Sequence, residues 1–101
     1  MVKRTASMGS RVMVSKDQVS SDLGGGEVAI LDFKSGTYHG LDAVGARVWS
    51  LIQEPKTIGE IRDVLLSEYE VERDRCERDL IALLQRLADE GLVEVGDEDT
   101  T

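Results

Sequence analysis

The segment that most constrains the fold is GTYHGLDAVGARVW, which spans residues 36–49. Threonine and tyrosine near its start favour extended backbone, and the glycine before them suits a turn. Asp42 can cap a helix, because its carboxylate can accept a hydrogen bond from a free amide of the first turn. Apolar residues then recur at helical spacing: Leu41, Val44, Val48 and Ile52. The sequence therefore predicts a short strand, Thr37–Leu41, joined directly to an amphipathic helix that begins at Asp42.

Two further strands are predicted before this joint. The run EVAILD, Glu27–Asp32, is almost wholly apolar in its middle, as in a central strand covered on both faces. It should pair with Thr37–Leu41 in an antiparallel hairpin, with Gly36 at a positive φ. Alternation of valine with other residues over 11–15 predicts a first strand. Ser20–Gly26, which contains three glycines, is expected to form a loop.

Three helices are expected after the hairpin. The first should end near Gln53, because the residue before proline is disfavoured in a helix. The run TIGE at 57–60 is a capping box that opens the second helix, which should end near Tyr69. The third should run from about Glu72 to Glu90, with Gly91 in the left-handed position after it. Strands followed by helices predict an α+β domain with a small antiparallel sheet.

Composition limits the classes of function. A chain of 101 residues is one domain with a small core, and its net charge of −8 argues against nucleic acid as a partner. It contains no apolar run of about 18 residues, so we expect no membrane segment. Residues 1–10 are expected to be a disordered lead-in and 96–101 an acidic tail. The single cysteine, Cys76, excludes an internal disulfide and fits a cytoplasmic location.

The sequence shows no recognisable catalytic or metal-binding set. His39, the single histidine, lies in a predicted strand without a cysteine or carboxylate at a motif spacing. Cys76 lies on the apolar stripe of the third helix and is expected to be a small core residue rather than a nucleophile. One histidine and one cysteine do not complete a zinc site. We therefore expect no enzyme activity, no metal and no cofactor, and a function that resides in a surface.

Two features indicate such a surface. Thr37–Leu41 is predicted to be a terminal strand of the sheet, and an exposed edge is a template for an added strand. The apolar residues of the third helix cover a wide arc, part of which could wall a groove beside that edge. Strand addition gains affinity from main-chain hydrogen bonds and selectivity from side-chain pockets.

The runs GTYHGLDAVGARVWSLI, TIGEI and ERDLIALLQRLADEGLVEV resemble the PqqD family, also called RiPP precursor recognition elements. The resemblance covers residues 11–95 and implies three antiparallel strands followed by three helices, in a winged-helix-like arrangement. It implies a non-catalytic adaptor that binds the leader peptide of a ribosomally made natural product, as the leader-binding subunit of lasso peptide biosynthesis does. The leader would add as a strand to the third strand and pack against the third helix. The residues so implied are Thr37, Tyr38, His39, Gly40 and Leu41 on the receiving edge, and Arg75, Cys76, Asp79, Leu83 and Arg86 on the helix.

The resemblance also implies partners: the precursor leader peptide and a separate leader peptidase, a transglutaminase-like cysteine protease, or another modifying enzyme. An open edge makes a weak homodimer plausible as well. A chaperone in quinone cofactor biosynthesis and a small subunit that only stabilises an enzyme remain as alternatives. A winged-helix DNA-binding regulator is a further alternative, but the arginines of residues 72–79 alternate with acidic residues that cancel their field.

Overall fold

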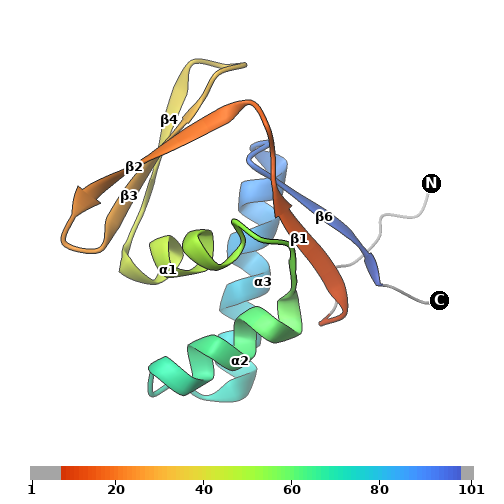
Figure 1. The fold of residues 1–101 in the computed structure, drawn as a ribbon. Helices are drawn as coiled ribbons and strands as arrows, with labels where there is room; N and C mark the ends of the chain where they lie inside the picture. Colours follow the sequence, from red (N-terminus) through yellow and green to blue (C-terminus); the bar gives the residue numbers. More distant parts are fainter. Residues whose placement is uncertain (1–7, 99–101) are drawn as a thin grey trace.

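The computed structural model describes residues 8–98, which form three helices and two three-stranded antiparallel sheets (Figure 1). The predicted α+β class is confirmed, with two sheets in place of one. One sheet has the strand order β5-β1-β6 and the other β2-β3-β4. In chain order the elements are β1 Ser10–Val14, β2 Gln18–Gly24, β3 Glu27–Asp32, β4 Thr37–Leu41, α1 Ala43–Leu51, β5 Lys56–Thr57, α2 Ile58–Glu68, α3 Arg73–Asp89 and β6 Val93–Glu98.

The predicted hairpin is present and carries an additional strand. β3 and β4 pair antiparallel with Ile30 opposite His39, and Gly36 has a φ of 69° in the turn between them, as predicted. β2 pairs with the other side of β3, so β3 is the central strand of this sheet. The loop predicted for Ser20–Gly26 is therefore wrong for most of its length. Its glycines form the turn to β3, where all three have positive φ, whereas the residues before them are extended.

The strand predicted within residues 11–15 lies in the other sheet, where β1 pairs with β5 and β6. β6 continues to Glu98, so the first residues of the predicted acidic tail, 96–98, belong to a strand that pairs along β1 as far as Ser10. The prediction that residues 1–10 form a disordered lead-in is wrong for the last of these residues. The carbonyl of Met8 accepts a hydrogen bond of 2.8 Å from the Gly59 amide. Residues 1–7 lie outside the described part of the chain.

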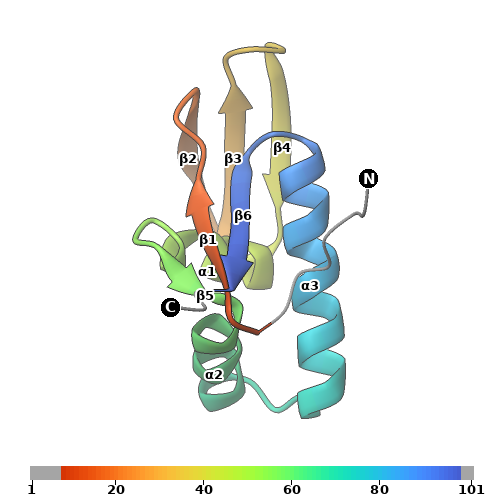
Figure 2. The same cartoon turned by 90° about the vertical axis from the view of Figure 1, so that its right-hand side faces the viewer.

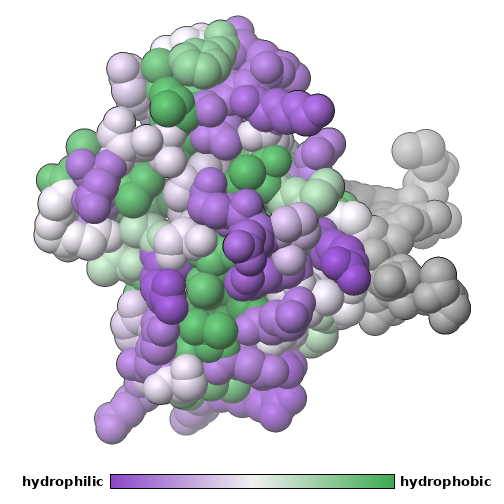
Figure 3. All heavy atoms as spheres, in the orientation of Figure 1, coloured by the Kyte–Doolittle hydropathy of each residue, from purple (hydrophilic) through white to green (hydrophobic). Residues whose placement is uncertain are grey.

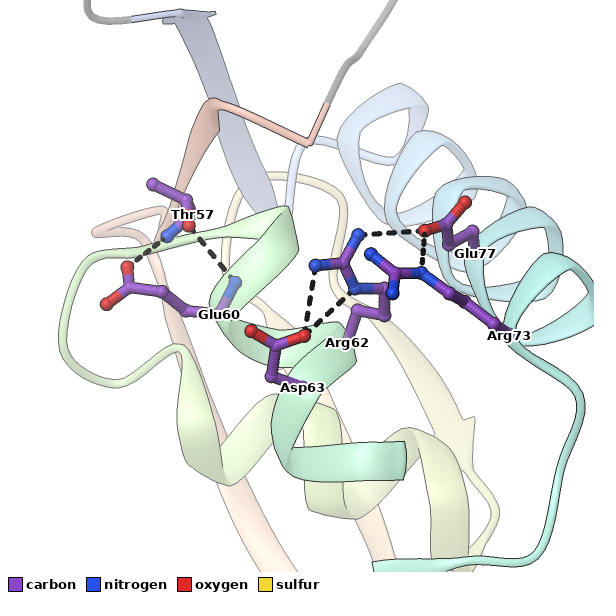
Figure 4. Close-up of polar contacts among 6 residues, drawn as sticks. All are labelled: Thr57, Glu60, Arg62, Asp63, Arg73 and Glu77. Atoms are coloured by element: carbon purple, nitrogen blue, oxygen red, sulfur yellow. Dashed lines mark hydrogen bonds and ion pairs between the residues drawn. The ribbon is translucent and has the colours of Figure 1, made fainter. Parts of the chain in front are cut away.

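The helix boundaries follow the local signals in the sequence. The Asp42 carboxylate caps α1 by accepting a 2.9 Å hydrogen bond from the Gly45 amide. Both bonds of the capping box between Thr57 and Glu60 are formed at the start of α2 (Figure 4). After α3, Gly91 has a φ of 77°, and the amides at 91 and 92 bond back to the carbonyls at 88 and 87. This is the Schellman ending that the sequence predicts.

One apolar core joins the two sheets and the three helices. It contains Val12 of β1, Ile30 of β3 and Val93 of β6, together with the buried faces of the helices. α3 contributes Cys76, Leu80, Leu84 and Leu87, and it packs against both α2 and β6, as its wide apolar arc predicts. Trp49 is also buried in this core. Among the described residues, no helix is long and apolar enough to cross a membrane.

Replacing Thr57 with alanine tests the cap of α2. The change removes the side-chain acceptor for the Glu60 amide and should lower the free energy of unfolding by about 1 kcal/mol. Urea denaturation followed by circular dichroism measures this, and the m-value should stay constant because the surface exposed on unfolding is unchanged. Stability equal to that of the wild type would show that the cap contributes nothing.

Candidate functional site

β4 is a free edge of its sheet. It pairs only with β3, and no strand within residues 8–98 lies on its other side. Side chains alternate along the strand: Tyr38 is exposed, whereas His39 is mostly covered and Leu41 is buried. Figure 2 shows the C-terminal end of α3 next to this strand. His39 Nδ1 lies 3.1 Å from Glu90 Oε2, so a polar contact joins the edge strand to the end of α3.

A groove of about 360 Å³ lies where α1, α2 and α3 meet. Its floor is apolar and buried, formed by Val48 of α1, Leu65 of α2 and Leu80 of α3. In the view of Figure 3, apolar side chains are exposed between α1 and α2, with hydrophilic residues around them. The complete lining is Val44, Val48, Leu65, Tyr69, Glu70, Val71, Arg75, Cys76, Asp79, Leu80 and Leu83.

Most of the helix residues implied by the family resemblance line this groove. Arg75, Cys76, Asp79 and Leu83 are all among its walls, whereas Arg86 is not. Arg86 lies about one helical turn beyond Leu83, where the groove ends on α3. The edge residues lie on β4, but the burial of the Leu41 side chain leaves only its backbone for a ligand.

The walls contributed by α1 and α2 were not predicted as site residues. Val44 and Tyr69 are exposed at the rim of the groove, together with the linker residue Val71. Val44 belongs to the periodic apolar set of α1, but that pattern is the same for a core residue and for a groove residue. Only its exposed fraction, 44%, separates the two.

The groove combines an apolar floor with charges at its rim. Glu70, Arg75 and Asp79 lie there, and Arg75 Nε is 3.7 Å from Asp79 Oδ2 in an exposed pair. Burial raises the pKa of the Cys76 thiol, so the thiol is protonated at neutral pH. This agrees with the prediction of a small core residue rather than a nucleophile. Among the described residues, no cluster of histidine, cysteine and carboxylate side chains could hold a metal ion.

Two ion-pair clusters hold the walls of the groove together. Arg47 of α1 donates two hydrogen bonds, of 2.9 and 2.7 Å, to the carboxylate of Glu68 on α2. Arg62 of α2 donates a 2.8 Å hydrogen bond to Glu77 of α3, and Arg73 approaches the same carboxylate oxygen at 3.4 Å (Figure 4). Charge-assisted hydrogen bonds of this kind are directional, so they favour one relative position of the helices that they join.

Residues 27–93, about two thirds of the chain, match the protein family described as "Coenzyme PQQ synthesis protein D (PqqD)". The chain belongs to the PqqD family. The matched region begins at β3 and ends at the first residue of β6. It therefore includes the free edge of β4 and every wall of the groove.

Two solved structures are similar to this PqqD-family domain. One is TbiB1 in complex with the TbiA(beta) leader peptide, which has 45% sequence identity to this chain and a TM-score of 0.76. The match covers 81% of this chain and 94% of the chain in that structure. The other is lasso peptide synthetase B1 complexed with the leader peptide, with 28% identity and a TM-score of 0.74, covering 82% of this chain and 96% of that one. No curated protein matches the sequence.

The arginine pairs make the stability of this domain depend on pH. Hydrogen bonds from Arg47 and Arg62 lower the pKa values of Glu68 and Glu77 in the folded state. A lowered pKa stabilises the fold while the carboxylate is ionised, and this contribution is lost as pH falls below the ordinary value of 4.5. We expect the free energy of unfolding to fall in that range, and to fall less steeply in Glu77→Gln. Urea denaturation at about pH 7 and about pH 3.5 measures both. If the wild type and Glu77→Gln lose the same free energy of unfolding between the two pH values, this role of Glu77 is contradicted.

Proposed function

We propose that this PqqD-family domain is a non-catalytic adaptor that binds the leader segment of a ribosomally made precursor, most directly a lasso peptide precursor. The observation that carries the proposal is the free edge of β4 together with an apolar groove whose lining includes Val44, three residues after the end of that strand. It is supported by the similarity to two proteins whose structures are leader-peptide complexes, over nearly the whole length of each.

In the proposed binding mode, the leader pairs antiparallel with β4 and becomes the fourth strand of the β2-β3-β4 sheet. Backbone groups of Thr37–Leu41 that do not bond to β3 supply the main-chain contacts, which depend little on leader sequence. Side chains on the helix-facing side of the added strand then reach the groove. There Cys76 and Leu83 offer apolar contact, and Arg75 and Asp79 offer charge at the rim.

The chemistry on the precursor belongs to a separate enzyme in this proposal. The candidates are a leader peptidase of the transglutaminase-like cysteine protease class and another modifying enzyme. The groove supplies one thiol, Cys76, and its raised pKa makes it a poor nucleophile. The adaptor would act in the cytoplasm, where precursors are translated, by holding the leader in an extended form.

Replacing Val44 with aspartate tests the groove. Val44 is 44% exposed in the first turn of α1, where a carboxylate is favourable to the helix, so the fold should be retained. The charge would lie at the rim beside the apolar floor of the groove and should weaken leader binding about tenfold or more, which is about 1.4 kcal/mol. The measurement is fluorescence anisotropy of a labelled synthetic TbiA(beta) leader peptide, the peptide in the complex of the similar protein TbiB1.

The matched control is Leu23→Asp, the same kind of change at an exposed apolar residue. Leu23 is 62% exposed on β2, the strand at the opposite edge of the sheet from β4. It should bind the leader as the wild type does. If both folded variants bind equally well, the groove is not the side-chain site. If the wild type does not bind the leader at all, the proposed function is wrong.

A further inference from the structure

The arginine side chains of the helices divide into paired and unpaired ones. Arg47 and Arg62 form ion pairs between helices. Arg73 and Arg75 form ion pairs within α3, each with a carboxylate four residues later. The guanidinium of Arg86 is exposed and forms no hydrogen bond or ion pair within the described part of the chain. Although acidic residues outnumber basic ones by 20 to 12 in this chain, Arg86 is left available to an anion from outside it.

The carboxylate best placed to pair with Arg86 is held by β4 instead. Glu90 follows Arg86 by four residues at the end of α3, a spacing that brings side chains together. Its carboxylate lies 3.1 Å from His39 Nδ1 on β4 and not against Arg86. The order arginine then glutamate is the weaker arrangement at this spacing, which favours the contact with His39. His39 thereby keeps Glu90 away from Arg86.

The His39 contact also shows which way this side of α3 faces. At about 100° per residue, Glu90 lies about 40° and Leu83 about 60° from Arg86, in the same sense around the helix. Glu90 contacts β4 and Leu83 lines the groove, so this flank of α3 faces both the edge strand and the groove. Asp89 is exposed and lies about 60° from Arg86 in the other sense. Arg86 thus lies on the flank that borders both parts of the proposed leader site, β4 and the groove.

The position of Arg86 along the leader site follows from the two residues of the His39–Glu90 contact. Figure 2 shows β4 and α3 next to each other with opposite chain directions. Arg86 lies about 6 Å before Glu90 along α3. Leu41 lies about 6.6 Å after His39 along β4, on the same face of the sheet. Because the chains are opposed, both steps lead the same way from the contact, and Arg86 is level with Leu41.

The inference rests on the proposed function, in which the leader pairs antiparallel with β4. One leader residue would then lie opposite Leu41, and the second residue after it would lie opposite His39. Residues directly opposite each other share a face of the sheet, so both leader side chains would point toward α3. The first would lie beside the guanidinium of Arg86, and the second beside the carboxylate of Glu90. A negative charge is therefore favourable at the first leader position and unfavourable at the second.

We propose that Arg86 is a specificity-determining residue that binds a carboxylate on the leader residue opposite Leu41. His39 and Glu90 are positioning residues, because their contact leaves Arg86 free to bind that carboxylate. An arginine can donate two parallel hydrogen bonds to one carboxylate, so the contact selects aspartate or glutamate at this position. It also fixes the register of the leader on β4, which main-chain hydrogen bonds alone do not do.

The test measures binding of a labelled TbiA(beta) leader peptide by fluorescence anisotropy at low salt, where exposed charges are weakly screened. Arg86→Gln removes the charge and should weaken binding about fivefold or more. The matched control is Arg78→Gln, because Arg78 is also an exposed α3 arginine without a partner in the described part of the chain. Arg78 lies about 80° from Arg86 on the side away from the groove, so Arg78→Gln should bind as the wild type does.

A second set of measurements separates leader recognition from helix stability, since a cation in the last turn of α3 also favours the helix. Each aspartate and glutamate of the peptide is replaced in turn by its amide. One replacement should weaken binding to the wild type about fivefold and leave binding to Arg86→Gln unchanged. His39→Val releases Glu90 to pair with Arg86, so the effect of that peptide replacement should shrink. Adding Glu90→Gln to His39→Val should restore the effect.

The outcomes distinguish this inference from the proposed function. If Arg86→Gln binds the leader as the wild type does, or if Arg78→Gln weakens binding equally, the inference is wrong and leader binding stands. The same holds if no single carboxylate of the peptide is coupled to Arg86. An undiminished effect of the peptide replacement in His39→Val would overturn the positioning role of His39 and Glu90. If the wild type does not bind the leader at all, the proposed function and the inference are both wrong.

Discussion

The structure depends on the joint between β4 and α1, where a strand becomes a helix with a single residue between them. Leu41 ends the strand in the core, and Asp42 caps the helix through the Gly45 amide at 2.9 Å. A Cβ on Gly45 would lie 3.3 Å from both the Asp42 carboxylate and the Leu41 side chain, so only glycine fits this position without displacement. The joint therefore fixes the free edge of β4 relative to the first turn of α1. Val44 in that turn is a wall of the groove, so the joint also places this wall three residues from the end of the edge strand.

Local signals in the sequence predicted the parts of the fold that local interactions determine. The cap at Asp42, the capping box at Thr57, the turn at Gly36 and the helix ending at Gly91 all form as expected. Each of them requires only residues within one or two turns of the chain. The pairing of β1 with β6 was not predicted, because it joins strands about 80 residues apart and is decided by the packed core. β2 was missed because its three glycines lie at its end and in the turn that follows, and not in the body of the strand.

The site was predicted in part for a similar reason. The family resemblance implies the edge strand and five α3 residues, of which four line the groove. The walls from α1 and α2 were missed because three helices meet there through contacts distant in sequence. The charged residues on these helices have a separate role, since Arg47 joins α1 to α2 and Arg62 joins α2 to α3 through ion pairs. None of the residues of these ion pairs is among the lining residues of the groove.

The most direct test of strand addition at β4 is amide hydrogen exchange measured by NMR with and without the leader peptide. In an edge strand, alternate residues direct their backbone groups away from the sheet. When the leader is bound, we expect alternate amides of Thr37–Leu41 to exchange more slowly by a factor of about ten or more. The amides that already bond to β3 should change little. The amides of β2, the other free edge, should not change. Protection at β2, or no protection at β4 with saturating leader, would contradict the account.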